Sequence, residues 1–300
     1  MHEIYLYGSI LTTDSFILDG EYPKNNGYGE FTEHHTHIGG ETGVAMAILA
    51  SYGIRVKGTG YDQGMVTGPI LKDYFKNTNA DLSALTFRDD FEGFHDYVFI
   101  DRANNTRTSF GPFGTLPKQL ESYYAIPKEE DIANAKVISI DPFQEGGSLL
   151  AAQYAVKHAK PYVTIDCPHD SYFAKNCSVA IISNDFIQNE YPDAVPEKLM
   201  EKYMEGSDAL YIFTYGGDTV YYGRSGIIKT MSPYKIKAMS TLGAGDSFRT
   251  GCVYGLYKMM SDDELVDFAC AMAACACQVY PLAKHLPTLE AIRDMQKRRA

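Results

Sequence analysis

Short apolar runs alternate with longer helix-like runs along this chain of 300 residues, and this alternation limits the fold more than any other feature. An apolar strand followed by an amphipathic helix brings the next strand in parallel to the first. The expected strands lie at residues 3–8, 136–141, 161–166, 178–183 and 209–217. The expected helices lie at residues 41–52, 148–159, 246–260 and 264–279. The pattern predicts an α/β fold with a mostly parallel sheet covered by helices on both faces.

The chain contains no proline-rich or charged linker, so we expect one domain over residues 1–300. Residues 10–37 and 86–113 are richer in turn and β-forming residues, and they could form a small subsidiary sheet inserted in that domain. Within the second segment, two strands would flank a turn at Asn104 and Asn105.

Charge and composition exclude several classes of function. The formal net charge of −11 argues against non-specific binding to nucleic acid or to an anionic membrane. The first residues lack the basic and apolar regions of a signal peptide, and no segment reaches the length of a membrane span. The six cysteines include no CxxC pair, which favours reduced core cysteines. We therefore expect a cytoplasmic protein.

Residues 241–248, TLGAGDSF, combine an open backbone with an acid. A helix that begins near Gly245 or Asp246 would present unpaired amides to an anion, and the glycines would let the anion approach closely. Asp246 would then accept a proton from a hydroxyl that attacks the anion. The alternative is a helix-capping aspartate after a glycine turn.

The segment TLGAGDSFRTG, residues 241–251, resembles the C-terminal signature of the PfkB, or ribokinase-like, carbohydrate kinases. Residues 39–53, 58–64 and 212–217 are similar to other family segments, in family order. The resemblance implies a ribokinase-like three-layer α/β/α fold with a small β-sheet lid. It also implies transfer of the γ-phosphate of ATP, with Mg²⁺, to a hydroxyl of a small sugar. The catalytic group would be Asp246 as base with the amides of Gly243, Ala244 and Gly245.

The resemblance also implies a set of substrate contacts. Those residues are Asp14, Gly39, Gly40 and Arg107. Val44 stands where the family usually has an asparagine, so one hydroxyl contact differs. The histidines of residues 33–40 offer at most two ligands on one strand face, which favours polar lining or exposure over a metal site.

Further residues are similar to the nucleotide site of the family. They are Asn184, Thr214, Gly216, Ala273, Ala274 and Cys277. Ile187 occupies the position of a glutamate that organises magnesium, so Glu190 or Asp185 would take that role through water or phosphate. Ser240 replaces an aspartate associated with a monovalent cation, which makes potassium dependence less expected.

The sequence leaves several substrates and one non-enzymatic function open. The substrate could be a nucleoside, a sugar phosphate or an amino-sugar conjugate, and a phosphorylated substrate would need at least two cations near the lid. A non-catalytic sugar or nucleotide sensor is the alternative outside enzymes. The expected partners are a small sugar and ATP, without nucleic acid or membrane, and the resemblance implies a homodimer through the lid.

Overall fold

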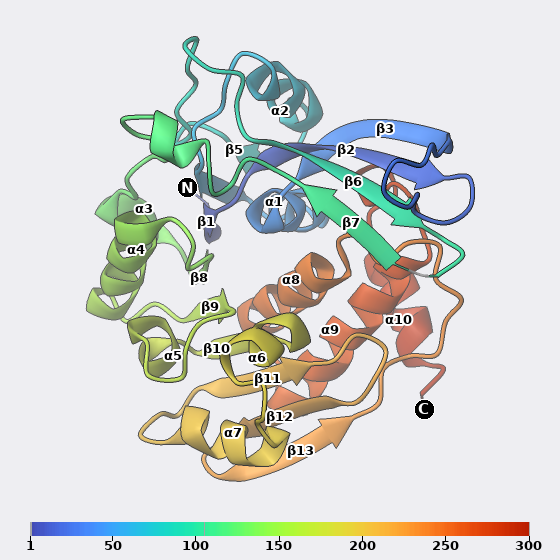
Figure 1. Cartoon of the computed structure of the whole chain (residues 1–300). Helices are drawn as coiled ribbons and strands as arrows, with labels where there is room; N and C mark the ends of the chain where they lie inside the picture. The colour runs from blue at the N-terminus through green and yellow to red at the C-terminus, as the bar shows by residue number, and fades with distance from the viewer. Residues whose placement is uncertain (1, 105, 300) are drawn as a thin grey trace.

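The computed structural model describes residues 2–104 and 106–299, so Asn105 of the expected turn lies outside the described residues. Within that part of the chain, the main sheet contains nine strands (Figure 1). From one edge to the other they are β13 (Ile227–Met231), β12 (Val220–Arg224), β11 (Leu210–Thr214), β10 (Val179–Ser183), β9 (Tyr162–Ile165), β8 (Val137–Ile140), β1 (Ile4–Gly8), β4 (Val56–Gly60) and β5 (Ala80–Asp81).

The run of strands from β11 to β5 is parallel throughout, and β12 and β13 are added antiparallel at one edge. The predicted fold class is therefore confirmed. The antiparallel edge hairpin was not predicted.

Helices cover both faces of the main sheet and form two cores. The first face packs against α1 (Glu41–Ser51), α2 (Thr67–Phe75), α8 (Ala244–Tyr257), α9 (Asp262–Cys277) and α10 (Leu289–Gln296). The second packs against α3 (Glu129–Asn134), α4 (Glu145–Lys157), α5 (Tyr172–Asn176), α6 (Asn184–Glu190) and α7 (Pro196–Met204). Strand β1 shows the alternation directly, because Ile4 and Leu6 enter the first core whereas Tyr5 and Tyr7 enter the second.

A second, smaller sheet lies beside the main sheet (Figure 1). Its strands, in spatial order, are β3 (Phe31–Gly39), β2 (Leu11–Leu18), β6 (His95–Asp101) and β7 (Thr106–Phe110). Strand β2 follows β1 almost directly, and β3 leads into α1 through Gly40. The second sheet is thus tied to the carboxyl end of β1 and to the beginning of α1.

Helices α8 and α9 begin two residues earlier than expected. Helix α8 begins at Ala244, because Gly243 adopts the left-handed conformation (φ 80°) that ends the preceding turn. Helix α9 begins at Asp262, because Ser261 and Glu264 form a capping box. No helix of residues 2–104 and 106–299 is long and apolar enough to cross a membrane.

Candidate active site

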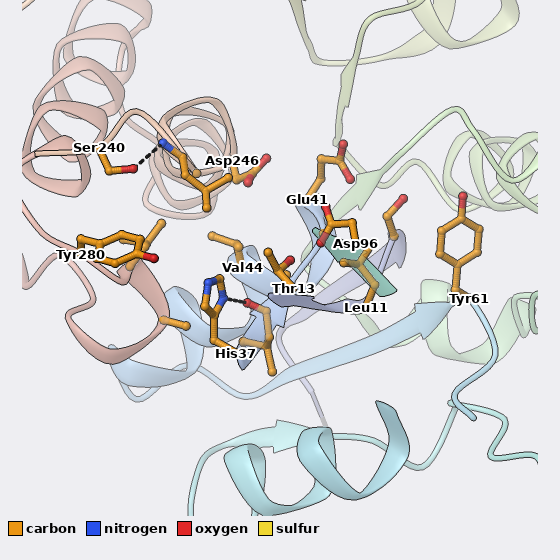
Figure 2. Close-up of a pocket in the computed structure, with 18 of the residues that line it drawn as sticks. Leu11, Thr13, His37, Glu41, Val44, Tyr61, Asp96, Ser240, Asp246 and Tyr280 are labelled. Carbon is orange, nitrogen blue, oxygen red and sulfur yellow. Dashed lines mark hydrogen bonds between the residues drawn. The ribbon is translucent and has the colours of Figure 1, made fainter. Parts of the chain in front are cut away.

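A cavity of about 420 Å³ lies between the carboxyl end of the main sheet and the second sheet. This is the edge at which ligands bind in open parallel sheets. The cavity is lined by the β1–β2 connection, by β3 and the start of α1, by β6, and by the start of α8. Figure 2 shows Glu41, Asp96 and Asp246 around it, each from a different element.

The start of α8 brings backbone amides to the cavity. Within the described residues, the amides of Gly243, Gly245 and Asp246 have no hydrogen-bond acceptor, whereas the Ala244 amide donates to the Thr241 carbonyl (3.2 Å). Two of the three predicted amides, those of Gly243 and Gly245, are therefore free to bind an anion, and the Asp246 amide joins them.

Backbone geometry makes glycine necessary at position 243. The φ of 80° is strained for other residues, and a Cβ there would lie 2.5 Å from the Cδ2 atom of Leu282. Gly243 thus allows the turn and the helix start to meet at this point.

The carboxyl group of Asp246 lines the cavity from the first turn of α8 and is half-buried. Burial raises the pKa of Asp246, and the nearby carboxylates of Asp141 and Asp96 raise it further. Arg249 and Arg107 act in the opposite direction, but the net pKa remains above the ordinary range of an aspartate. A raised pKa makes this carboxylate a better proton acceptor.

Glu41 is a second acid in the cavity, and the sequence analysis missed it. It is the first residue of α1, directly after Gly40. Burial raises the pKa of Glu41, and repulsion from Asp141 and Asp246 adds to the effect. A glutamate in the first turn of a helix reads as an ordinary capping residue, so the sequence gives no signal of this position.

A buried ion pair supports the floor of the site. The guanidinium of Arg249, one turn after Asp246 in α8, pairs with Asp141 at the end of β8, and it also donates to the Ser139 hydroxyl (2.7 and 3.0 Å). Asp141 in turn accepts from the Ser9 amide (2.6 Å) and the Thr42 hydroxyl (3.1 Å). The pair thereby joins β8 and α8 to the β1–β2 connection and to α1.

Comparison with known proteins identifies the family. The model of the pfkB family carbohydrate kinases matches residues 132–289, which is more than half of the chain and includes Asp141, Asp246 and Arg249. The chain belongs to the pfkB family of carbohydrate kinases. It is therefore a phosphotransferase with a sugar hydroxyl as acceptor, and both the family and the enzyme class predicted from the sequence are confirmed.

Relatives and solved structures agree with this assignment. The 5-dehydro-2-deoxygluconokinase of Clostridium beijerinckii is 25% identical over 91% of this chain and 88% of its own length. The ribokinase of Arabidopsis thaliana, complexed with ribose and ATP, has a TM-score of 0.78 at 14% identity, with 99% of each chain covered. An E. coli protein provisionally named ribokinase II, in complex with ATP and Mg²⁺, has a TM-score of 0.80 at 12% identity, covering 99% of this kinase and all of that chain. The two structures establish the ribokinase-like fold.

The predicted substrate residues of this kinase divide into two groups. Gly39 and Gly40 line the cavity, where a Cβ on Gly40 would lie 2.3 Å from the Ser9 carbonyl oxygen. Arg107 lies outside the lining; it is exposed on β7 and donates to the Thr241 hydroxyl (3.3 Å). From there it still lowers the pKa of Asp246.

Asp14, the remaining predicted substrate residue, is not among the residues that line the cavity. Its carboxylate is held by the Thr36 hydroxyl and by His34 and His95 (2.8 Å each), away from the cavity lining. The neighbouring residue Thr13 lines the cavity instead, because successive residues of β2 point to opposite faces.

Asp96 supplies a carboxylate at the position where Asp14 was expected. It lies opposite Thr13 in the pairing of β2 with β6 and lines the cavity. Nothing local in the sequence singles out Asp96, because the pairing of these strands brings together segments that are far apart in the chain.

The predicted nucleotide residues lie outside the lining of this cavity. Asn184 begins α6 after β10, and Thr214 ends the adjacent strand β11, where it pairs with Ser183. Gly216 follows in an exposed turn with a φ of 62°. The strand pairing thus brings the Asn184 and Thr214 segments together at the carboxyl edge of the sheet.

Three predicted nucleotide residues lie on the last turns of α9. Ala274 is buried in the core, so it offers little surface to a ligand, whereas Ala273 and Cys277 are half-buried. The Cys277 carbonyl accepts from the amides of Met239 and Ser240 (2.8 and 3.3 Å). These bonds attach the segment before α8 to the end of α9.

The residues predicted to organise magnesium, Asp185 and Glu190, are exposed at the two ends of α6. Within the described part of the chain, no three His, Cys, Asp or Glu side chains are grouped so that they would hold a metal ion. His37 lines the cavity and bonds to the Ser15 hydroxyl (2.9 Å) and the Ile38 carbonyl (2.8 Å). Burial lowers the pKa of His37, which favours a neutral ring.

Proposed function

We propose that this kinase binds its sugar in the cavity between the two sheets and transfers the γ-phosphate of ATP to it at Asp246. The observation that carries the proposal is the placement of Asp246 beside unpaired amides at the start of α8, facing the cavity. The Asp246 carboxylate would orient the attacking hydroxyl and accept its proton. The amides of Gly243 and Gly245 would stabilise the charge on the transferred phosphoryl group.

We infer that ATP lies along the carboxyl edge of the sheet toward β10, β11 and the end of α9. Asn184, Thr214, Gly216, Ala273 and Cys277 border that region. Magnesium would neutralise part of the triphosphate charge and, because the described side chains offer no ready cluster, would be held chiefly by phosphate and water. Asp185 and Glu190 remain the candidates to contact that water shell.

The second sheet would act as a lid in a single kinase domain. It closes one side of the cavity through Leu11, Thr13, His37 and Asp96. A closed lid would exclude water and suppress hydrolysis of ATP. The six cysteines of the described chain are free thiols, which favours a reducing compartment such as the cytoplasm.

The outer face of the lid is the surface that we propose for a homodimer. Phe16 packs there against Phe31, His34 and Phe99, with ring centroids 4.4–5.1 Å apart. Phe31 is 54% exposed and Tyr97 on the same sheet is 48% exposed. Exposed aromatic side chains of this kind are typical of protein interfaces.

The test is ADP release from magnesium-ATP with a panel of sugars, for the natural chain and for Asp246→Asn. We expect one sugar class to stimulate ADP release, and the substitution to lower kcat by about 10²–10⁴-fold. Glu201→Gln is the matched control, because Glu201 is an exposed carboxylate on α7. Near-normal turnover by Asp246→Asn would refute the assignment of the base.

A further inference from the structure

The acidic side chains that line the proposed sugar-binding cavity outnumber its basic ones. Three carboxyl side chains line it, those of Glu41, Asp96 and Asp246. No lysine or arginine is found among its lining residues in the described part of the chain. The cavity therefore lacks the cations that an anionic substrate would need.

The positive charges close to the cavity are already engaged. Arg249 is paired with Asp141 behind the cavity wall and is 1% exposed. Arg107 donates to Thr241 outside the lining. The His37 ring is kept neutral by burial, as its lowered pKa indicates. The lining itself thus supplies no cation to balance its carboxyl groups, and Arg249 and Arg107 act on Asp246 only from outside it.

Asp96 gives an independent indication of a ligand. Its Oδ1 atom is buried and has no hydrogen-bond partner among the described residues. A buried carboxylate oxygen without a donor is costly, because its hydration is lost and not replaced. A substrate donor at the Asp96 position would remove that cost.

Aromatic rings border the same cavity. Tyr61, Phe113 and Phe143 contribute to its lining. The faces of aromatic rings attract cations and also pack against the C–H groups of sugars. The rings therefore suit a sugar, either neutral or positively charged.

An organic cation fits this arrangement better than a metal ion does. Glu41, Asp96 and Asp246 come from three separate elements, and they are not grouped closely enough to hold a metal among the described residues. Three carboxylates spread over a cavity of about 420 Å³ suit one extended molecule with several donors.

We propose that the phosphoryl acceptor is a sugar that carries a protonated amine, with its ammonium group held by Asp96 and Glu41. This inference rests on the proposed kinase function and names its substrate class. A sugar phosphate, or a sugar acid of the kind in the name 5-dehydro-2-deoxygluconokinase, would meet three carboxylates instead. The substrate of this kinase would therefore differ from that named for its relatives.

The reaction remains transfer to oxygen. The hydroxyl oxygen forms a bond to the γ-phosphorus, the bond from that phosphorus to the bridging oxygen of ATP breaks, and ADP leaves. The hydroxyl proton passes to Asp246. The amine is not the nucleophile, because a protonated amine has no free electron pair, and it serves only as the group that is recognised.

Binding measurements separate this inference from the kinase function. The probes are glucosamine and 1-amino-1-deoxyfructose, each beside its N-acetylated form, which keeps the hydroxyls and removes the charge, with gluconate as the anionic comparison. Calorimetry in the presence of ADP should show that at least one of the two amines binds about tenfold or more tightly than its own N-acetylated form. Gluconate should bind more weakly than either.

Substitutions then locate the ammonium group. Asp96→Asn and Glu41→Gln should each reduce the preference for the amine over its N-acetylated form, whereas Glu201→Gln on the surface should leave it unchanged. Equal or tighter binding of the N-acetylated forms or of gluconate would overturn the inference, and so would no binding of either amine. Tight amine binding without ADP release that depends on Asp246 would instead refute the kinase mechanism and leave the substrate class standing.

Discussion

Replacing Arg249 by Met tests how the active site is held together. The side chains of Arg249 and Asp141 are 1% and 0% exposed, and the pair is hydrogen-bonded to partners from three parts of the chain, Ser139, Ser9 and Thr42. Met keeps the length of the side chain and removes its charge, so Asp141 would keep only the Ser9 amide and the Thr42 hydroxyl. Removal of one partner from a buried pair costs about 3–5 kcal/mol. That is a large part of a typical stability of about 5–15 kcal/mol.

Urea unfolding followed by circular dichroism measures this cost, since the chain has no tryptophan for fluorescence. The double variant Arg249→Met/Asp141→Asn should lose much less stability than the sum of its single variants, because it removes both charges. Arg55→Met is the control: Arg55 is 58% exposed and lies 3.6 Å from Glu3, so its loss should cost less than about 1 kcal/mol. A cost for Arg249→Met as small as that of the control, or additive effects in the double variant, would refute the reasoning.

Four further predictions concern catalysis, recognition and assembly. Gly243→Ala should lower stability by about 1–3 kcal/mol because of its positive φ, and should slow ADP release; thermal unfolding and the kinase assay measure the two effects. The apparent pKa of the acidic limb in a plot of kcat/KM against pH should lie above the ordinary range of an aspartate. Burial raises the pKa of Asp246, and activity is lost as the pH falls through that value. Asp14→Asn should leave the KM for the sugar within about twofold in steady-state assays, since the altered charge lies outside the cavity lining. Phe31→Lys should shift a lid-mediated dimer to monomer in size-exclusion chromatography with light scattering, and an unchanged mass would argue against that interface.

The fold could be predicted largely from local patterns. Apolar strands such as residues 136–141 and 161–166, with the helix expected at 148–159 between them, specify a parallel sheet because few other arrangements bury both faces of each strand. The hairpin of β12 and β13 was not predicted, because the prediction relied on continuous apolar runs. Its second strand is mostly exposed at the sheet edge, so it carries no continuous apolar run.

The placement of the proposed catalytic loop at a helix start could also be predicted, because its residues lie within one short segment. Gly243, Gly245 and Asp246 are close in sequence, and the geometry of a helix start follows from that closeness. The partners of the loop could not be found in this way. Arg249 is followed in α8 by a mostly apolar run, and an arginine there indicates a buried partner, but nothing local indicates that the partner is Asp141.

Asp14 shows how strand geometry limits prediction by position in the sequence. A β-strand has a period of two, so a shift of one residue moves a side chain to the opposite face of the sheet. The connection after β1 is about one residue longer here than the family pattern, and it places Thr13 rather than Asp14 on the cavity side. The carboxylate is recovered from β6, where Asp96 is paired with Thr13. The cavity thus has an acid on the side of the second sheet, which comes from β6 rather than from β2, and another acid, Glu41, at the start of α1. The set of carboxyl groups that line the cavity therefore depends on strand pairing, and we expect the charge of the assembled cavity to be a better guide to the substrate than any single residue.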